Sequence, residues 1–169
     1  GWSVAVDAGR NVLVTGTHGG NLNVGGQVLN NGGQANIFAA KLSSLGEVVW
    51  SRGFGEPFLR TAFAVASGAD TLLTGGFSGA VEPEGGAWSE RHGSGAPDVF
   101  VARLDGDGDH IWSARFGGGT TQVGISVAMD AAHNTIVAGY FEGTIRIGIA
   151  KLGSRGAADS NVFVARFAT

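Results

Sequence analysis

Residues 98–104 read DVFVARL, and after a turn residues 111–117 read IWSARFG. The chain repeats these phrases elsewhere, as NIFAAKL at 36–42, VWSRGFG at 49–55 and NVFVARF at 161–167. Phe38, Phe100 and Phe163 are therefore 62 and 63 residues apart. This regular spacing indicates an internal repeat of about 60 residues, and such repeats are typical of propellers and solenoids.

The strand predicted for the first phrase is apolar on both of its faces. Phe100, Ala102 and Leu104 share one face by strand alternation, while Val99 and Val101 share the other. A strand that is apolar on both faces must be covered on both, so we expect sheets stacked against neighbours of the same kind. A basic residue in each copy is expected to mark where the strand emerges into solvent: Lys41, Arg103 and Arg166.

A hairpin is predicted upstream of each Phe-containing strand. In the first copy, residues 3–7 and 12–16 alternate as strands do, and Gly and Asn fill the turn between them. About twenty less regular residues follow, so each copy supplies four or five short strands. Units of this size fit the antiparallel blades of a β-propeller. The runner-up is a β-solenoid, whose coils are usually about 20–30 residues long.

The predicted fold is therefore all-β, with about three four- to five-stranded β-propeller blades and a ring that one chain does not close. We assign residues 1–60 to the first unit, 61–123 to the second and 124–169 to the third, which lacks its last strand. Propellers have about four to eight blades. We therefore expect self-association, in which a dimer gives six blades, or completion by the rest of a longer chain.

Composition favours many tight turns and excludes several functions. The 169 residues include 31 glycines and 3 prolines, and the segments between the glycines are too apolar for disorder. The net charge is −3, and the basic residues are scattered singly, which argues against binding of nucleic acid. No apolar run approaches the length of a membrane span, and the lack of cysteine excludes disulfides.

The repeat resembles a known family, the bacterial β-propeller repeat called SBBP. Its phrase is approximately D-x-x-G-N-x-Y-V-T-G-x-F-x-G-T, followed by D-x-F-V-A-K-L-D-x-x-G-x-x-x-W-x-x-x-F-G-G. The matching residues are Asp7, Gly9, Asn11, Val14, Thr15 and Gly16; Thr74, Gly75, Phe77, Gly79, Asp98, Phe100, Val101, Ala102, Arg103, Leu104, Asp105, Gly108, Trp112, Phe116, Gly117 and Gly118; and Asp130, Asn134, Val137, Gly139, Phe141, Gly143, Thr144, Phe163, Val164, Ala165 and Arg166. The second unit departs at its first turn, where Ala66 and Asp70 replace the Asp and the Asn. The resemblance implies a scaffold of a secreted or surface protein of a bacterium, without a shared catalytic residue.

The turn at residues 105–109 resembles the start of a calcium loop, with Asp105, Asp107 and Asp109 at alternate positions. The rest of an EF-hand is missing, and the first unit does not carry carboxylates at all three of these positions. We therefore favour a solvated hairpin turn and keep a calcium site as the alternative.

The other candidate residues recur in the repeat or lack the spacing of a site. Asp7 and Asp130 occupy equivalent turns, so we expect them to cap the backbone. Trp50 and Trp112 recur at one position, which favours packing within the blade over stacking on a sugar. The histidines are expected at the surface, since they lack the spacing of a metal site: His18, His92, His110 and His133.

Trp88 lies in a variable connector near Arg91 and His92, and these three are the candidate ligand-binding residues. They would suit a carbohydrate-binding propeller. The leading hypothesis is instead a non-enzymatic structural or interaction module without a cofactor, in an extracellular or cell-surface assembly with a protein or glycan partner. A third hypothesis is the non-catalytic portion of a larger propeller enzyme. A designed or excised propeller fragment that self-assembles fits the same sequence pattern as a natural subunit does.

Overall fold

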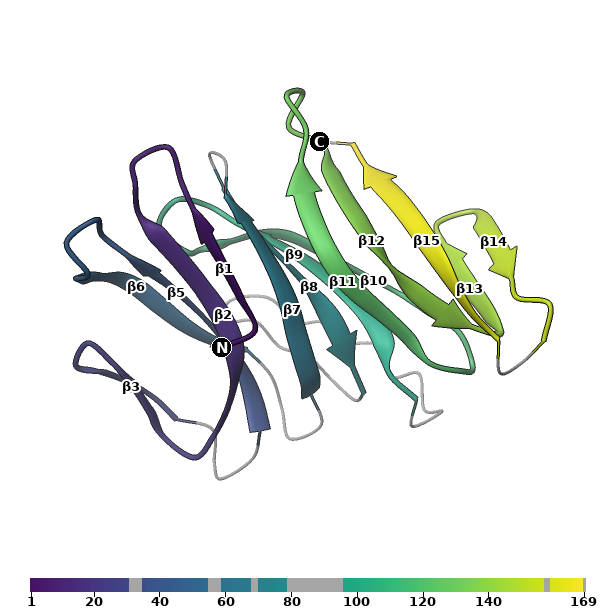
Figure 1. The fold of residues 1–169 in the computed structure, drawn as a ribbon, viewed down its shortest axis with the longest axis horizontal. Helices are drawn as coiled ribbons and strands as arrows, with labels where there is room; N and C mark the ends of the chain where they lie inside the picture. Colours follow the sequence, from purple (N-terminus) through teal and green to yellow (C-terminus); the bar gives the residue numbers. More distant parts are fainter. Residues whose placement is uncertain (31–34, 55–58, 68–69, 79–95, 157–158, 169) are drawn as a thin grey trace.

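The computed structural model consists of antiparallel β-sheets, three of which share one arrangement (Figure 1). The structure describes residues 1–169 apart from 31–34, 55–58, 68–69, 79–95, 157–158 and 169, and apart from the side chains of 35 and 59–67. The described residues form strands and turns without a helix, so the all-β prediction is confirmed. Within these residues no helix is long and apolar enough to cross a membrane.

Each of the three larger sheets is built from strands that follow one another in the chain, with a short hairpin inserted in the first and third. The first sheet has the order β1 (Ser3–Val6), β2 (Val12–Gly19), β5 (Ala35–Leu42), β6 (Val48–Phe54). The second has the order β7 (Leu59–Ser67), β8 (Thr71–Phe77), β9 (Asp98–Leu104), β10 (His110–Phe116). The third has the order β11 (Gln122–Met129), β12 (Thr135–Glu142), β15 (Ser160–Phe167). The inserted hairpins are β3 (Leu22–Val24) with β4 (Gln27–Leu29) and β13 (Thr144–Ile147) with β14 (Ala150–Gly153). None of the described sheets closes into a barrel.

Each larger sheet pairs a glycine of its second strand with the phenylalanine of its third. The pairs are Gly16 with Phe38, Gly75 with Phe100 and Gly139 with Phe163. The glycine leaves room for the ring, because a Cβ on Gly139 would lie 2.7 Å from Cε1 of Phe163. In the first two sheets, Thr15 and Thr74 donate a hydrogen bond of 2.8 Å to the carbonyl of that phenylalanine. These contacts explain why Thr, Gly and Phe recur together in the sequence.

The two central strands of the second sheet, β8 and β9, are buried on both of their faces. The contact of this sheet with the first sheet is a cluster of Leu13, Ile37, Ala39, Trp50 and Phe54 with Leu73, Phe77, Phe100, Ala102 and Leu104. Its contact with the third sheet and hairpin is a cluster of Leu72, Val99, Val101 and Phe116 with Val127, Val137, Phe141, Ile145, Phe163 and Ala165. Leu72 and Leu73, which are neighbours on β8, therefore point into different clusters. The expectation that the Phe-containing strand is covered on both faces is confirmed for β9.

The first strands of the three sheets lie side by side. β7 contacts β1 and β2 of the first sheet, and β11 contacts β7 and β8. Figure 1 shows the three sheets following one another across the molecule in the order of the sequence. Each sheet therefore packs mainly on the sheet that precedes or follows it in the chain.

Candidate functional site

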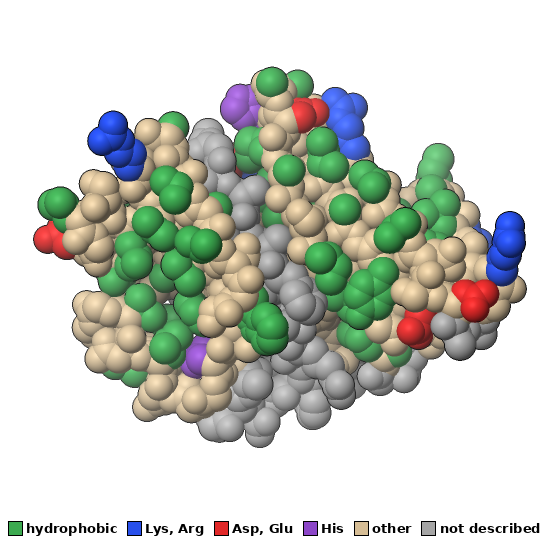
Figure 2. All heavy atoms as spheres, viewed as in Figure 1, with side chains coloured by type: hydrophobic (Ala, Val, Ile, Leu, Met, Phe, Trp, Pro, Cys, Tyr) green, Lys and Arg blue, Asp and Glu red, His purple; other side chains and the backbone are tan. Residues whose placement is uncertain are grey.

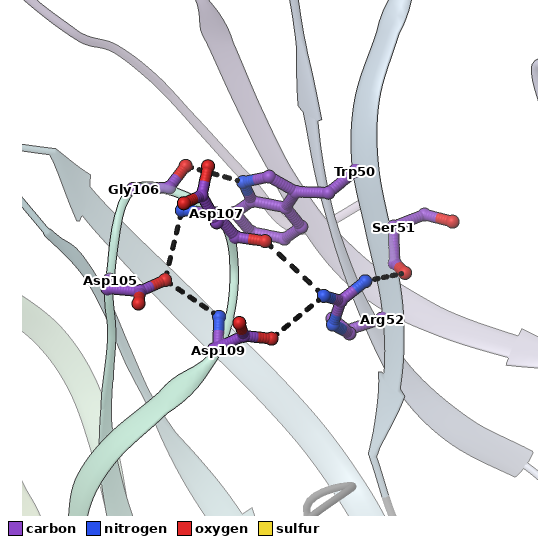
Figure 3. A network of polar contacts seen from close by, with 7 residues as sticks. All are labelled: Trp50, Ser51, Arg52, Asp105, Gly106, Asp107 and Asp109. Carbon is purple, nitrogen blue, oxygen red and sulfur yellow. Dashed lines mark hydrogen bonds and ion pairs between the residues drawn. The ribbon is translucent and has the colours of Figure 1, made fainter.

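The best-defined polar site lies between the first two sheets, where the turn from β9 to β10 meets β6 (Figure 3). In this turn the Asp105 amide donates to the Asp109 carbonyl at 2.9 Å, and the Gly108 amide donates to the Asp105 carbonyl at 3.1 Å. Oδ1 of Asp105 accepts hydrogen bonds from the amides of Asp107 and Asp109, both at 2.9 Å. Gly108 has a φ of 83°, a conformation that favours glycine. Asp105 and Gly108 thus determine the shape of the turn.

The turn from β5 to β6 has the same shape with a different cap. The Ser43 amide donates to the Glu47 carbonyl at 2.7 Å, and Gly46 has a φ of 84°. Oγ of Ser43 accepts from the amides of Leu45 and Glu47 at 3.3 and 3.2 Å. The turn is therefore part of the repeat, whereas its full set of carboxylates is not.

The indole of Trp50 is buried under the turn of the second unit. Its Nε1 donates to the Gly106 carbonyl at 3.1 Å, and the residue is 3% exposed. A Cβ on Gly108 would lie 2.7 Å from Cδ2 of Trp50, so the turn backbone rests on the ring only because residue 108 is glycine. The hydrogen bond satisfies the one polar atom of the buried indole. Trp50 therefore packs between the first and second sheets. The glycine that recurs in this turn, Gly46 in the first unit and Gly108 in the second, is the sequence feature that could have indicated a close contact with the indole.

Two basic side chains of the first sheet complete this contact. Nη2 of Arg52 donates to Oδ1 of Asp109 at 3.1 Å and to the Asp107 carbonyl at 3.3 Å. Nζ of Lys41 donates to the Gly106 carbonyl at 3.5 Å. The Asp109 side chain is 72% exposed, and an exposed ion pair contributes at most about 1 kcal/mol. These contacts orient the turn more than they stabilise the fold.

Two of the three carboxylates of the calcium alternative have separate partners in the structure. Oδ1 of Asp105 holds two amides of its own turn, and Oδ1 of Asp109 is paired with Arg52. Among the residues that the structure describes, no group of three or more His, Cys, Asp or Glu side chains is placed to hold a metal ion. The geometry thus favours a capped turn at residues 105–109.

The corresponding place between the second and third sheets is a groove. Trp112 occupies the repeat position of Trp50, and its ring centroid lies 5.9 Å from that of Phe167. The groove has a volume of about 400 Å³ and is lined by Arg103, Ile111, Trp112, Ala114, Phe167 and Ala168. Within the described part of the chain, no turn covers Trp112 in the way that residues 105–109 cover Trp50.

Each unit also has an ion pair between its Phe-containing strand and its first turn. The pairs are Lys41 with Asp7 at 3.1 Å, Arg103 with Asp70 at 2.6 Å and Arg166 with Asp130 at 3.4 Å. The expectation that these bases emerge into solvent is wrong for Lys41 and Arg103, whose side chains are 15% and 11% exposed. In the second unit the acid stands at the last position of the turn and still reaches Arg103. The sequence analysis identifies Asp70 as a departure from the repeat but does not predict its ion pair with Arg103.

The first turns of the first and third units are capped as predicted. Oδ1 of Asp7 accepts from the Asn11 amide at 2.8 Å, and Oδ1 of Asp130 accepts from the Asn134 amide at 2.9 Å. Burial raises the pKa of Asp7, but hydrogen bonds from Asn11 and the ammonium of Lys41 outweigh it, so the net pKa lies below the usual value. Hydrogen bonds from Asn134 likewise hold the pKa of Asp130 below its usual value.

Replacing Asp7 with asparagine is expected to lower the melting temperature near neutral pH and to matter little in acid. Asparagine keeps an acceptor for the Asn11 amide but cannot form the ion pair with Lys41. A lowered folded-state pKa contributes stability above the unfolded pKa of about 4, and this stability is lost as the pH falls through the folded-state pKa. The melting temperatures of both proteins from about pH 7 to about pH 3 test this. A difference that stays constant over the whole range would mean that the Asp7 charge is not its cause.

The remaining candidates are distributed over the molecule. The ligand-binding candidates Trp88, Arg91 and His92 lie outside the described residues. His18 and His110 are half-buried, with ring nitrogens 2.9 Å from the Gly20 carbonyl and from Oγ of Ser113. Of the three histidines that the structure describes, only His133 is exposed as expected. The described histidines are not brought together.

Comparison with known proteins gives no relative from which a function could be transferred. No protein-family description matches the chain, and no curated protein matches it either. The physical contacts described above therefore have to carry any proposal about function.

Proposed function

We propose that this chain is a non-enzymatic β-propeller module that serves as a structural or interaction scaffold in an extracellular assembly. The observation that carries the proposal is the burial of β8 and β9 on both faces by sheets of the same repeat. In this proposal each of the three larger sheets is one blade. The side-by-side first strands β1, β7 and β11 would then line the axis of the ring.

The two outer faces of this stack expose apolar side chains. On the third sheet, Val162 and Val164 are 84% and 72% exposed, although their counterparts Val99 and Val101 are buried against the next sheet. Figure 2 shows hydrophobic side chains spread over β11, β12 and β15. On the outer face of the first sheet, Val4 and Val6 of β1 are 66% and 62% exposed. Contiguous exposed apolar surface of this kind marks an interaction site.

A second copy of the chain fits these faces. The outer face of the third sheet corresponds to the face that each sheet presents to its successor, and the outer face of the first sheet corresponds to the face presented to a predecessor. Two copies could therefore bury both faces with the contact that already occurs twice within one chain. Because the two faces differ, the contact is of the heterologous type, which closes only if the rotation per unit completes a ring.

Light scattering on the purified chain is expected to give an assembly with twice the chain mass of 17.1 kDa. Replacing Val164 with lysine places a charge on the outer face of the third sheet and should shift the assembly toward monomer. The matched control is Val28→Lys, since Val28 is exposed on the separate β3–β4 hairpin. A chain that stays monomeric at every concentration and melts cooperatively would overturn the assembly proposal.

A further inference from the structure

The third sheet has one open edge where the first two sheets have a strand. β5 pairs with β2 on one side and β6 on the other, and β9 pairs with β8 and β10. Among the described strands, their counterpart β15 pairs only with β12. An edge strand presents backbone amide and carbonyl groups that can pair with a further strand. Sheet geometry alone thus leaves room for a fourth strand beside β15.

The groove at Trp112 is a second feature that distinguishes the third sheet from the first two. In the first interface the space over Trp50 is filled by residues 105–109, which immediately precede the fourth strand β10. In the second interface the space over Trp112 is the groove of about 400 Å³, which Phe167 and Ala168 also line. Because Phe167 ends β15, the groove lies where a turn from β15 to a neighbouring strand would lie.

The two inserted hairpins give a third, independent comparison. Gly25 and Gly148 occupy the same hairpin position and have φ values of 55° and 57°. A Cβ on Gly25 would overlap the side chain of Val48, the first residue of the fourth strand β6. A Cβ on Gly148 would meet no atom within 4 Å. The β3–β4 hairpin therefore rests on a fourth strand, whereas the same surface of the β13–β14 hairpin is open.

We propose that the edge of β15, the groove at Trp112 and the β13–β14 hairpin form one acceptor site for an extended peptide strand. The fitting partner begins with a tight, acidic, glycine-containing turn and continues as a strand that carries Trp and Phe, the chemistry of residues 105–117. Its turn lies on Trp112, near Arg103, just as the turn of the second unit lies on Trp50 near Lys41. Its strand pairs antiparallel with β15, in the manner of strand addition to an exposed sheet edge.

The second sheet also predicts the register of this pairing. There Val101 lies opposite Ala114, and Val99 lies opposite Phe116. Val164 and Val162 hold the corresponding positions on β15. The residue of the partner strand that corresponds to Ala114 should therefore lie beside Val164.

A labelled synthetic peptide of residues 105–117 tests the proposal by fluorescence anisotropy. We expect saturable binding to the intact chain, weakened at least about tenfold by Trp112→Phe in the protein. Gly108→Val in the peptide should weaken binding as much, because the φ of 83° and the close approach to the indole exclude a side chain. Val28→Ala in the protein is the matched control and should leave binding unchanged. Absence of saturable binding at about 1 mM peptide, or equal binding of the Gly108→Val peptide, would overturn the proposal.

Disulfide cross-linking tests the register without depending on affinity alone. The chain has no cysteine, so Val164→Cys in the protein and Ala114→Cys in the peptide are the only thiols in the mixture. With dissolved oxygen as the oxidant, a disulfide should form between the two thiols, and much less should form with Val162→Cys, which lies two residues away. Equal cross-linking at both positions would contradict an ordered strand.

The proposed acceptor site rests on the proposed organisation of repeated sheets. The experiments nevertheless distinguish failure of the acceptor site from failure of the assembly proposal. Peptide binding is measured below the concentration at which light scattering detects association. A chain that associates without binding the peptide contradicts the acceptor site alone. A chain that binds the peptide and stays monomeric contradicts the assembly alone.

Discussion

Replacing Gly139 with alanine is expected to lower the free energy of unfolding by about 3 kcal/mol, toward the upper end of what overpacking costs. The added Cβ would overlap the backbone carbonyl oxygen of Val123 on β11 and would lie 2.7 Å from the ring of Phe163 on β15. One methyl group would therefore push β12 away from both of its neighbours. Because the total stability of a domain is about 5–15 kcal/mol, urea unfolding should show a large shift of the midpoint.

Gly53→Ala is the matched control for this effect. Gly53 lies on β6 opposite Phe38, and a Cβ there would meet no atom within 4 Å. At such a site the same substitution should leave stability nearly unchanged or raise it by about 0.4–1 kcal/mol, since alanine restricts the unfolded chain. Similar losses at both positions would mean that glycine is needed for strand flexibility and not for room under the Phe163 ring.

The parts of the fold that the sequence predicts well are those set by local pattern. Alternation and glycine spacing predict the β1–β2 hairpin and place the Phe-containing strand in each unit. The apolar character of both sides of residues 98–104 predicts the double burial of β9, because no other arrangement hides Phe100 and Val101 together. These inferences need only the geometry of a strand.

The parts that the sequence does not predict depend on contacts between units. The Asp105 carboxylate, which resembles a metal ligand in the sequence, caps its own turn, and the equivalent Ser43 shows that a hydroxyl can do the same. The turn backbone accepts a hydrogen bond from Trp50, more than 50 residues earlier, and no local pattern reports that meeting. The sequence does not predict the ion pair between Arg103 and Asp70, because Asp70 stands four residues after Ala66, which occupies the aspartate position of the repeat. Contacts across sheets require the register and stacking to be known first.

Replacing Leu72 or Leu73 with alanine is expected to destabilise the protein by about 2–5 kcal/mol in each case. The two leucines are adjacent on β8, and they are 0% and 1% exposed. Leu73 packs against the first sheet and Leu72 against the third, so each substitution opens a cavity in a different cluster. If one face of the second sheet were exposed to solvent, the leucine on that face would tolerate alanine well, since substitutions at exposed sites change stability by only about 0.5 kcal/mol.

Val164→Ala provides the matched control, because Val164 is 72% exposed on the outer face of the third sheet. Below the concentration of association its substitution should cost no more than about 0.5 kcal/mol. Urea unfolding of the three variants therefore separates a stack of three sheets from a single two-layer core. A large loss for Leu73→Ala with almost none for Leu72→Ala would mean that the third sheet does not cover the second in solution. The acceptor edge of β15 would then lose the packed sheet on which it depends.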